Sequence, residues 1–192
     1  MTTTPHVAPA DPSQQLQFLR HNFDNHQNLI RLADAKAAAY VTLIVFLAAS
    51  AFAIAKDVVG KLRWHWGGGA FTSCVYVISY AGLLLAFLRI VKLTHDVIKP
   101  RGARHYTAPQ AVHSLMFYEH VLLHDSNESY FNAIAVASLD LLIRNTSDQV
   151  FELAHICSEK MAAVTRARRP LLIAFISWVL NMCAGLFIVR WA

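Results

Sequence analysis

Four side chains that can bind an anion lie close together in a loop near the middle of the chain. Lys99, Arg101, Arg104 and His105 stand in the segment KPRGARHYTAP, where proline and glycine disfavour a helix. Lysine and arginine donate several hydrogen bonds each, and a loop can fold around a phosphate. These four residues are our candidate ligand-binding group. The alternative is that they contact anionic lipid headgroups and fix the orientation of the chain in a membrane.

The ten histidines suggest metal binding or hydrolysis. His120 and His124 stand four residues apart beside Glu119 and Asp125, which is a possible divalent-metal pair, but no HExxH pattern accompanies them. The dipeptides at 95–96 and 124–125 occur in HD phosphohydrolases, which need a larger aqueous core and more ligands than this chain offers. Motifs for acyl or phosphoryl transfer are absent from the sequence. We therefore predict a protein that is no enzyme and holds no metal or cofactor.

One carboxylate lies at the edge of an apolar segment. Asp34, followed by Lys36, stands just before the uncharged run that begins at Ala37. If the first and last helices run side by side, Asp34 comes to the same depth as Arg166 and Arg168. An ion pair there would be stronger than in open water, because the local dielectric constant is lower.

A stripe of small and amide side chains follows one face of the last apolar segment. Ser177, Asn181 and Gly185 are spaced four apart. Such residues let helices approach closely in lipid, and asparagine can hydrogen-bond to a neighbouring helix. The stripe could pack against other helices of the same protomer or form a face for self-association, and the sequence leaves both alternatives open.

Three apolar segments must position these groups. Residues 37–55, 70–88 and 170–189 carry no charge, and a helix of nineteen residues is about 28 Å long, close to the hydrocarbon thickness of a bilayer. The whole chain is 56% hydrophobic and only 15% charged, which favours a small integral membrane protein over a soluble one with buried core helices.

The remaining segments read as water-exposed. Residues 1–10 form a polar tail, 11–36 an amphipathic helix continuous with the first span, 56–69 a short external turn and 190–192 the external end. Residues 89–169 form a helical sensor region that contains a short helix at 111–124. A capping box at 125–128 opens a helix through Ile143, and a further capping box at 146–149 opens the helix that runs into the last span. The fold class is therefore an all-α membrane protein with three transmembrane helices and a cytoplasmic helical bundle. The first and last helices extend from the membrane as a paired stalk.

Charge asymmetry predicts the orientation. With a cytoplasmic N-terminus, only four of the 17 lysines and arginines face outside, namely Lys56, Lys61, Arg63 and Arg190. We read the formal charge of +5 as this topology signal rather than as a nucleic-acid patch. The polar start of the chain lacks the features of a cleavable signal peptide, so we expect the first span to direct insertion. We expect no disulfide among Cys74, Cys157 and Cys183, which form no spaced motif.

Several short motifs resemble a known family. The segment LADAKAAA at 32–39 opens the first span, and Asp148, Gln149, Glu152 and Lys160 precede a basic run and the last span. These positions and the order of elements from about residue 12 onward resemble the transmembrane effectors of Pycsar anti-phage systems.

The resemblance implies a non-enzymatic effector in the bacterial inner membrane. Such an effector is activated by a cyclic pyrimidine mononucleotide, cUMP or cCMP, which a partner cyclase makes after phage infection. It then impairs membrane integrity and causes abortive-infection cell death, and we expect it to form a homo-oligomer on activation. The resemblance supplies no base-reading residues. Two other classes stay open: a scaffolding inner-membrane subunit without a nucleotide ligand, and a membrane-anchored metal-dependent hydrolase.

Overall fold

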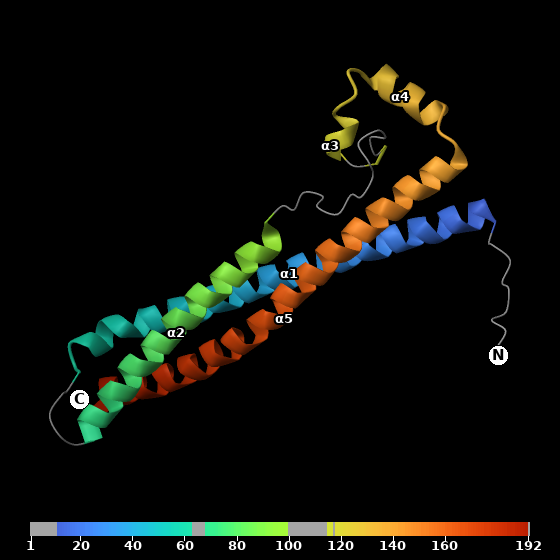
Figure 1. The fold of residues 1–192 in the computed structure, drawn as a ribbon. Helices are drawn as coiled ribbons and strands as arrows, with labels where there is room; N and C mark the ends of the chain where they lie inside the picture. Colours follow the sequence, from blue (N-terminus) through green and yellow to red (C-terminus); the bar gives the residue numbers. More distant parts are fainter. Residues whose placement is uncertain (1–10, 63–67, 100–114, 117, 192) are drawn as a thin grey trace, which may run out of the picture. The chain divides into compact units, whose positions relative to one another are not determined.

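A computed structural model describes residues 11–62, 68–99, 115–116 and 118–191. Every regular element in these ranges is a helix, which confirms the predicted all-α class. The candidate ligand residues Arg101, Arg104 and His105 lie outside the described residues, as does the start of the helix predicted at 111–124. The helices are α1 (Pro12–Val59), α2 (Gly68–Ile98), α3 (Tyr118–Val121), α4 (Asn127–Ala135) and α5 (Leu139–Trp191) (Figure 1).

The chain divides into two compact units. We call Met1–Ile30 with Arg101–Ser158 the head unit, and Arg31–Pro100 with Glu159–Ala192 the membrane unit. Helices α1 and α5 each contribute residues to both units. Each unit is described by itself below.

Helix α1 is the single long helix that its uninterrupted apolar stripe predicts. It begins at Pro12, where the Asp11 carbonyl accepts a hydrogen bond of 3.0 Å from the Gln15 amide, so Asp11 is the capping residue and proline occupies the first helical position. It ends at Val59, because Gly60 follows and disfavours a further turn.

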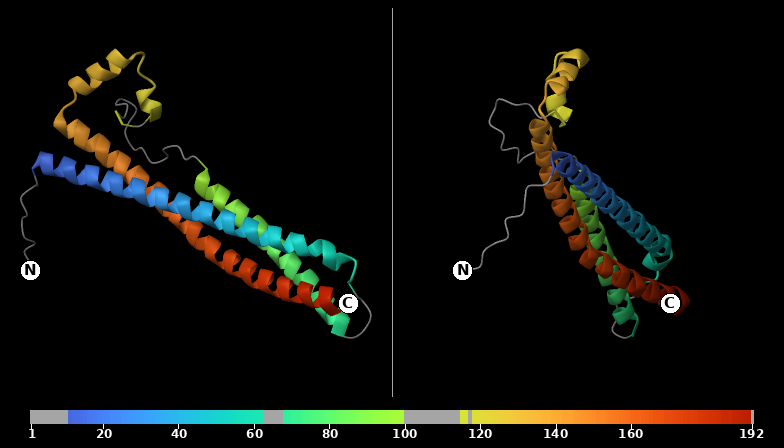
Figure 2. Two further views of the ribbon diagram at one scale, coloured as in Figure 1. Left: turned by 180° about the vertical axis from the view of Figure 1, so that it is seen from behind. Right: turned by 90° about the vertical axis from the view of Figure 1, so that its right-hand side faces the viewer.

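The membrane unit is a bundle of three helix segments from α1, α2 and α5, which lie along one another in Figures 1 and 2. Its central cluster joins Ile44 and Leu47 of α1, Leu83 and Ile90 of α2, and Ala174 of α5, all of them buried. Helix α2 continues to Ile98, well past the uncharged run that ends at residue 88. The last turns of α2 therefore carry charged side chains while remaining helical.

The outside of this bundle is apolar. Large hydrophobic side chains from all three helices are exposed, among them Phe46, Phe52, Phe71, Ile78, Leu85 and Leu172. All three helices are long and apolar enough to cross a membrane. A surface of this composition is stable in lipid and not in water, so the chain is a membrane protein with three spans.

In the head unit, the helix predicted from the capping box at 125–128 through Ile143 is in fact two helices. Ser126 caps α4, its hydroxyl oxygen accepting a hydrogen bond of 3.1 Å from the Ser129 amide. Helix α4 stops at Ala135, and the hydroxyl oxygen of Ser138 accepts a bond of 3.2 Å from the Leu141 amide at the start of α5. The second serine is a cap that competes with helix continuation, which is why the predicted helix breaks there.

The capping box predicted at 146–149 does not open a helix, because α5 already runs through it from Leu139. The Thr146 hydroxyl donates 2.8 Å back to the Leu142 carbonyl, a bond that threonine makes inside a helix. Pro170 also lies inside α5 and does not end it. The predicted helix at 111–124 is described only as the single turn of α3.

Candidate functional site

An ion pair joins the first and last helices in the membrane unit. Lys160 Nζ lies 2.6 Å from Asp34 Oδ1, with the lysine side chain 10% exposed and the aspartate side chain 41% exposed. We predicted Arg166 or Arg168 as the partner of Asp34. The structure corrects this, because both arginines are exposed and the pairing cation is Lys160.

The difference comes from how the two helices are aligned. Ala33 and Ala37 of α1 are fully buried against Ala163 and Val164 of α5, with Val97 of α2 beside them. Small side chains permit this close approach, and their packing determines the register of the two helices. Aligning the ends of the two uncharged runs, as in the sequence-based prediction, gives a different register. Arg166 lies six residues beyond Lys160, about 9 Å further along the helix. Lys36 is exposed and outside the pair.

A polar layer is buried among the spans. Asn181 of α5 is 0% exposed, and its Nδ2 donates 3.2 Å to the Tyr76 carbonyl and 3.4 Å to Ser79 Oγ of α2. Among the described residues, Asn181 Oδ1 and the Tyr76 hydroxyl are buried without a hydrogen-bond partner. Unsatisfied polar atoms inside a bundle are costly, which makes this layer a candidate functional site.

The other two residues of the predicted stripe also face the protomer's own helices. A Cβ on Gly82 of α2 would lie 2.9 Å from Ser177 Oγ, and a Cβ on Gly185 would lie 3.1 Å from Ile54 Cγ2 and 3.2 Å from Tyr76 Cε2. The Trp178 indole donates 2.7 Å to Ser50 Oγ next to them. Of the two alternatives that the sequence left open, the structure has packing within the protomer. A second copy would reach Ser177, Asn181 and Gly185 only after the bundle opens.

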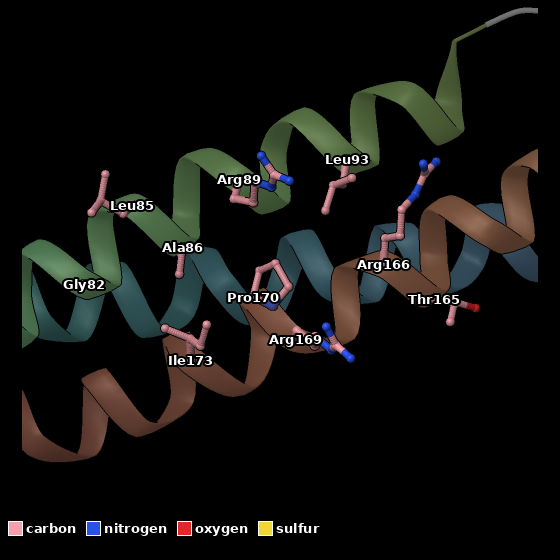
Figure 3. Close-up of a pocket in the computed structure, with 10 residues that line it drawn as sticks. All are labelled: Gly82, Leu85, Ala86, Arg89, Leu93, Thr165, Arg166, Arg169, Pro170 and Ile173. Carbon is pink, nitrogen blue, oxygen red and sulfur yellow. The ribbon is translucent and has the colours of Figure 1, made fainter.

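Three arginines border one cavity of about 890 Å³ in the membrane unit. Arg89 comes from α2, and Arg166 and Arg169 come from α5 (Figure 3). Sequence reasoning treated Arg89 and Arg169 only as topology signals, and Arg166 also as a possible partner of Asp34. Arg89 directly follows one uncharged run and Arg169 directly precedes another. This position indicates that both arginines lie near the same edge of the membrane.

Polar side chains in the head unit hold the segment before α3. Asn145 Oδ1 accepts a bond of 3.1 Å from the Leu115 amide, and the Tyr130 hydroxyl donates 2.7 Å to the Leu115 carbonyl. Burial raises the pKa of the Cys157 thiol on the same helix as Asn145. All three cysteines are free.

The four family-motif positions lie on α5. Glu152 and Lys160 are buried, and Asp148 and Gln149 are half-buried. Asp148 and Glu152 stand four residues apart, so they share one helix face. Lys99, the one candidate ligand residue among those described, is exposed.

A family model described as the Pycsar effector protein domain matches residues 18–189. The match covers all three spans and most of the head unit. No curated protein and no solved structure matches the chain.

Proposed function

We propose that this chain, which belongs to the Pycsar effector protein domain family and is an antiviral-defence effector in a membrane, is activated by cUMP or cCMP. The active form then impairs the membrane and kills the infected cell. The family implies a cyclase partner and a cyclic nucleotide signal in general. The choice of a pyrimidine nucleotide, the inner membrane, the cytoplasmic N-terminus and action without catalysis belong to the proposal.

One observation carries the coupling between ligand and membrane. Helix α5 is unbroken from Leu139 in the head unit to Trp191 at the end of the last span. A change in how the head unit packs around the first part of α5 would therefore act on the same helix that forms the last span. The ligand can shift this equilibrium only by as much as it prefers the active packing.

The proposed ligand site is the basic segment that follows α2 in the sequence. The basic residues Lys99, Arg101, Arg104 and His105 would bind the cyclic phosphate as hydrogen-bond donors and cations. Glu152 of the head unit is buried at 4% exposure. Ligand sites contain a few polar groups placed among apolar ones, and a buried carboxyl is a group of that kind.

The proposed lesion needs several copies, because three spans are too few to enclose a water path. The polar layer of Asn181, Tyr76 and Ser79 supports this step, since opening the bundle would present hydrogen-bonding groups to another protomer. Large apolar side chains of the head unit are also exposed, among them Phe18, Leu122, Phe131 and Val136. Exposed apolar surface of this kind is typical of association sites.

The test combines binding with killing. Calorimetry on detergent-purified protein should detect cUMP or cCMP and show much weaker binding of cAMP and cGMP. The pyrimidine nucleotide that binds should also trigger dye entry into cells that make the protein. Binding of no nucleotide would favour the scaffolding subunit, and preferential binding of a purine nucleotide would refute the proposed signal.

A further inference from the structure

The cavity bordered by Arg89, Arg166 and Arg169, here called the arginine cavity, has two chemically different walls. The three guanidinium groups belong to exposed side chains, and no acidic residue is among the residues that line the cavity. The other wall is apolar and includes Leu85 and Ile173, which are exposed toward the lipid-facing surface. The ring of Pro170 stands between α2 and α5 in Figure 3.

The depth of this cavity follows from the packing of the three helices. The uncharged run of α1 starts at Ala37, which lies in one buried cluster with Val97 of α2 and Ala163 of α5. From that level Arg89 lies eight residues further toward the bilayer centre and Arg169 six, or about 12 Å and about 9 Å. At these depths α1 already exposes large apolar side chains such as Phe46.

Arg166 lies only three residues beyond Ala163, or about 4.5 Å. The three cations therefore extend from this level toward the bilayer centre, and each needs an anion or a path to the headgroups. A guanidinium at the boundary with lipid is stabilised by a partner that accepts several hydrogen bonds, and phosphate matches its planar donors. The described lining supplies no such partner. The anion must therefore come from outside the cavity, and the surrounding solvent at this level is lipid.

We propose that the arginine cavity binds the phosphate of an anionic phospholipid, with the glycerol and first methylene groups against Leu85 and Ile173. A zwitterionic lipid carries its own ammonium group, which the three arginines repel. A lipid with two phosphates matches the three cations more closely than a lipid with one. The bound lipid bridges α2 and α5 next to Pro170, where proline has removed one hydrogen bond of the α5 backbone.

The experiment is native mass spectrometry of the full chain, released from detergent micelles after incubation with defined lipids. Cardiolipin, phosphatidylglycerol and phosphatidylcholine are compared at equal concentration. We expect retention in that order. Each of Arg89→Gln, Arg166→Gln and Arg169→Gln should weaken cardiolipin retention about fivefold, the usual effect of one cation near an anionic lipid surface.

Arg168→Gln is the matched control, because Arg168 is an exposed cation beside Arg169 that does not line the cavity. It should retain cardiolipin like the unchanged protein. An equal loss in Arg168→Gln would show attraction by net charge and overturn the proposal, as would equal retention of phosphatidylcholine. Arg89→Lys keeps the charge without the planar donors and should lose less than Arg89→Gln; an equal loss would point to damaged packing instead.

A last arm separates lipid from a free anion. Millimolar inorganic phosphate should leave cardiolipin bound, because it offers the arginines an anion but makes no contact with the apolar wall. Displacement of the lipid by inorganic phosphate would assign the arginine cavity to a free phosphate and refute the lipid assignment.

Discussion

The ion pair between Asp34 and Lys160 predicts unequal effects for the two single substitutions. Asp34→Ala leaves the ammonium group of Lys160, whose side chain is 10% exposed, without its partner. Lys160→Met leaves the carboxylate of Asp34, whose side chain is 41% exposed and can be hydrated instead. The aspartate variant should therefore be the less stable of the two, although both remove the same 2.6 Å contact.

The magnitudes follow from the two exposures. Removing one partner of a fully buried pair costs about 3–5 kcal/mol, whereas an exposed pair contributes about 0–1 kcal/mol. Because Lys160 is close to the first limit, we expect Asp34→Ala to lower the free energy of unfolding by about 2–3 kcal/mol. Lys160→Met should cost about 1 kcal/mol, since its methylene groups keep most of the packing. For a chain of this size, these values correspond to melting temperatures lower by about 5–10 °C and about 2–4 °C.

The assay is thermal unfolding of both variants and the double variant in one detergent, followed by circular dichroism. Lys36→Met is the control, because Lys36 is an exposed lysine two residues from Asp34 with no part in the pair. It should leave the melting temperature within about 1 °C. The double variant should be more stable than Asp34→Ala alone, because no charge is left unpaired. A larger loss for Lys160→Met than for Asp34→Ala would refute the reasoning.

Three further predictions concern the spans and the orientation. Gly82→Ala should lower the melting temperature, because its new Cβ would lie 2.9 Å from Ser177 Oγ. Adding Ser177→Ala should restore the melting temperature, since the next contact is Ser177 Cβ at 3.7 Å; no restoration would mean that another contact is responsible. Asn181→Leu should change the free energy of unfolding by less than about 1 kcal/mol, because only the nitrogen of the amide has hydrogen-bond partners. Nucleotide-triggered dye entry should fall at matched expression, and unchanged dye entry would remove the polar layer from the mechanism. Asn132 lies on the exposed side of α4, clear of the Ser126 cap. In a background without native cysteines, Asn132→Cys should resist an impermeant maleimide added outside intact cells, and ready labelling would place the head unit outside.

The features that depend on local pattern could be predicted from the sequence. The three uncharged runs predict the spans, and the start of α1 at Pro12 follows from a cap and a proline next to each other. The break between α4 and α5 was missed, although Ser138 stands where a capping serine is needed. A serine in an apolar stretch is equally consistent with a helix interior, so sequence pattern alone does not decide the case.

The candidate site depends on register, which the sequence does not determine. Matching the ends of the uncharged runs predicts Arg166 or Arg168 beside Asp34, whereas the close packing of Ala37 against Ala163 brings Lys160 there instead. That same shift places Arg89 and Arg169, which border the arginine cavity, deeper than Lys36, the last charge before the uncharged run of α1. Alanines carry no signal that distinguishes a tight helix crossing from an ordinary apolar position, so this result required the structure.

The most direct test of the central claim is leakage from vesicles that contain only the purified protein. Liposomes of phosphatidylethanolamine, phosphatidylglycerol and cardiolipin are loaded with a self-quenching dye and exposed to each cyclic nucleotide in turn. We predict dye release on addition of cUMP or cCMP to vesicles with the protein, and none with cAMP, cGMP or protein-free vesicles. Nucleotide binding without any release, across protein densities that allow several copies per vesicle, would contradict the claim that the activated protein itself breaches the membrane.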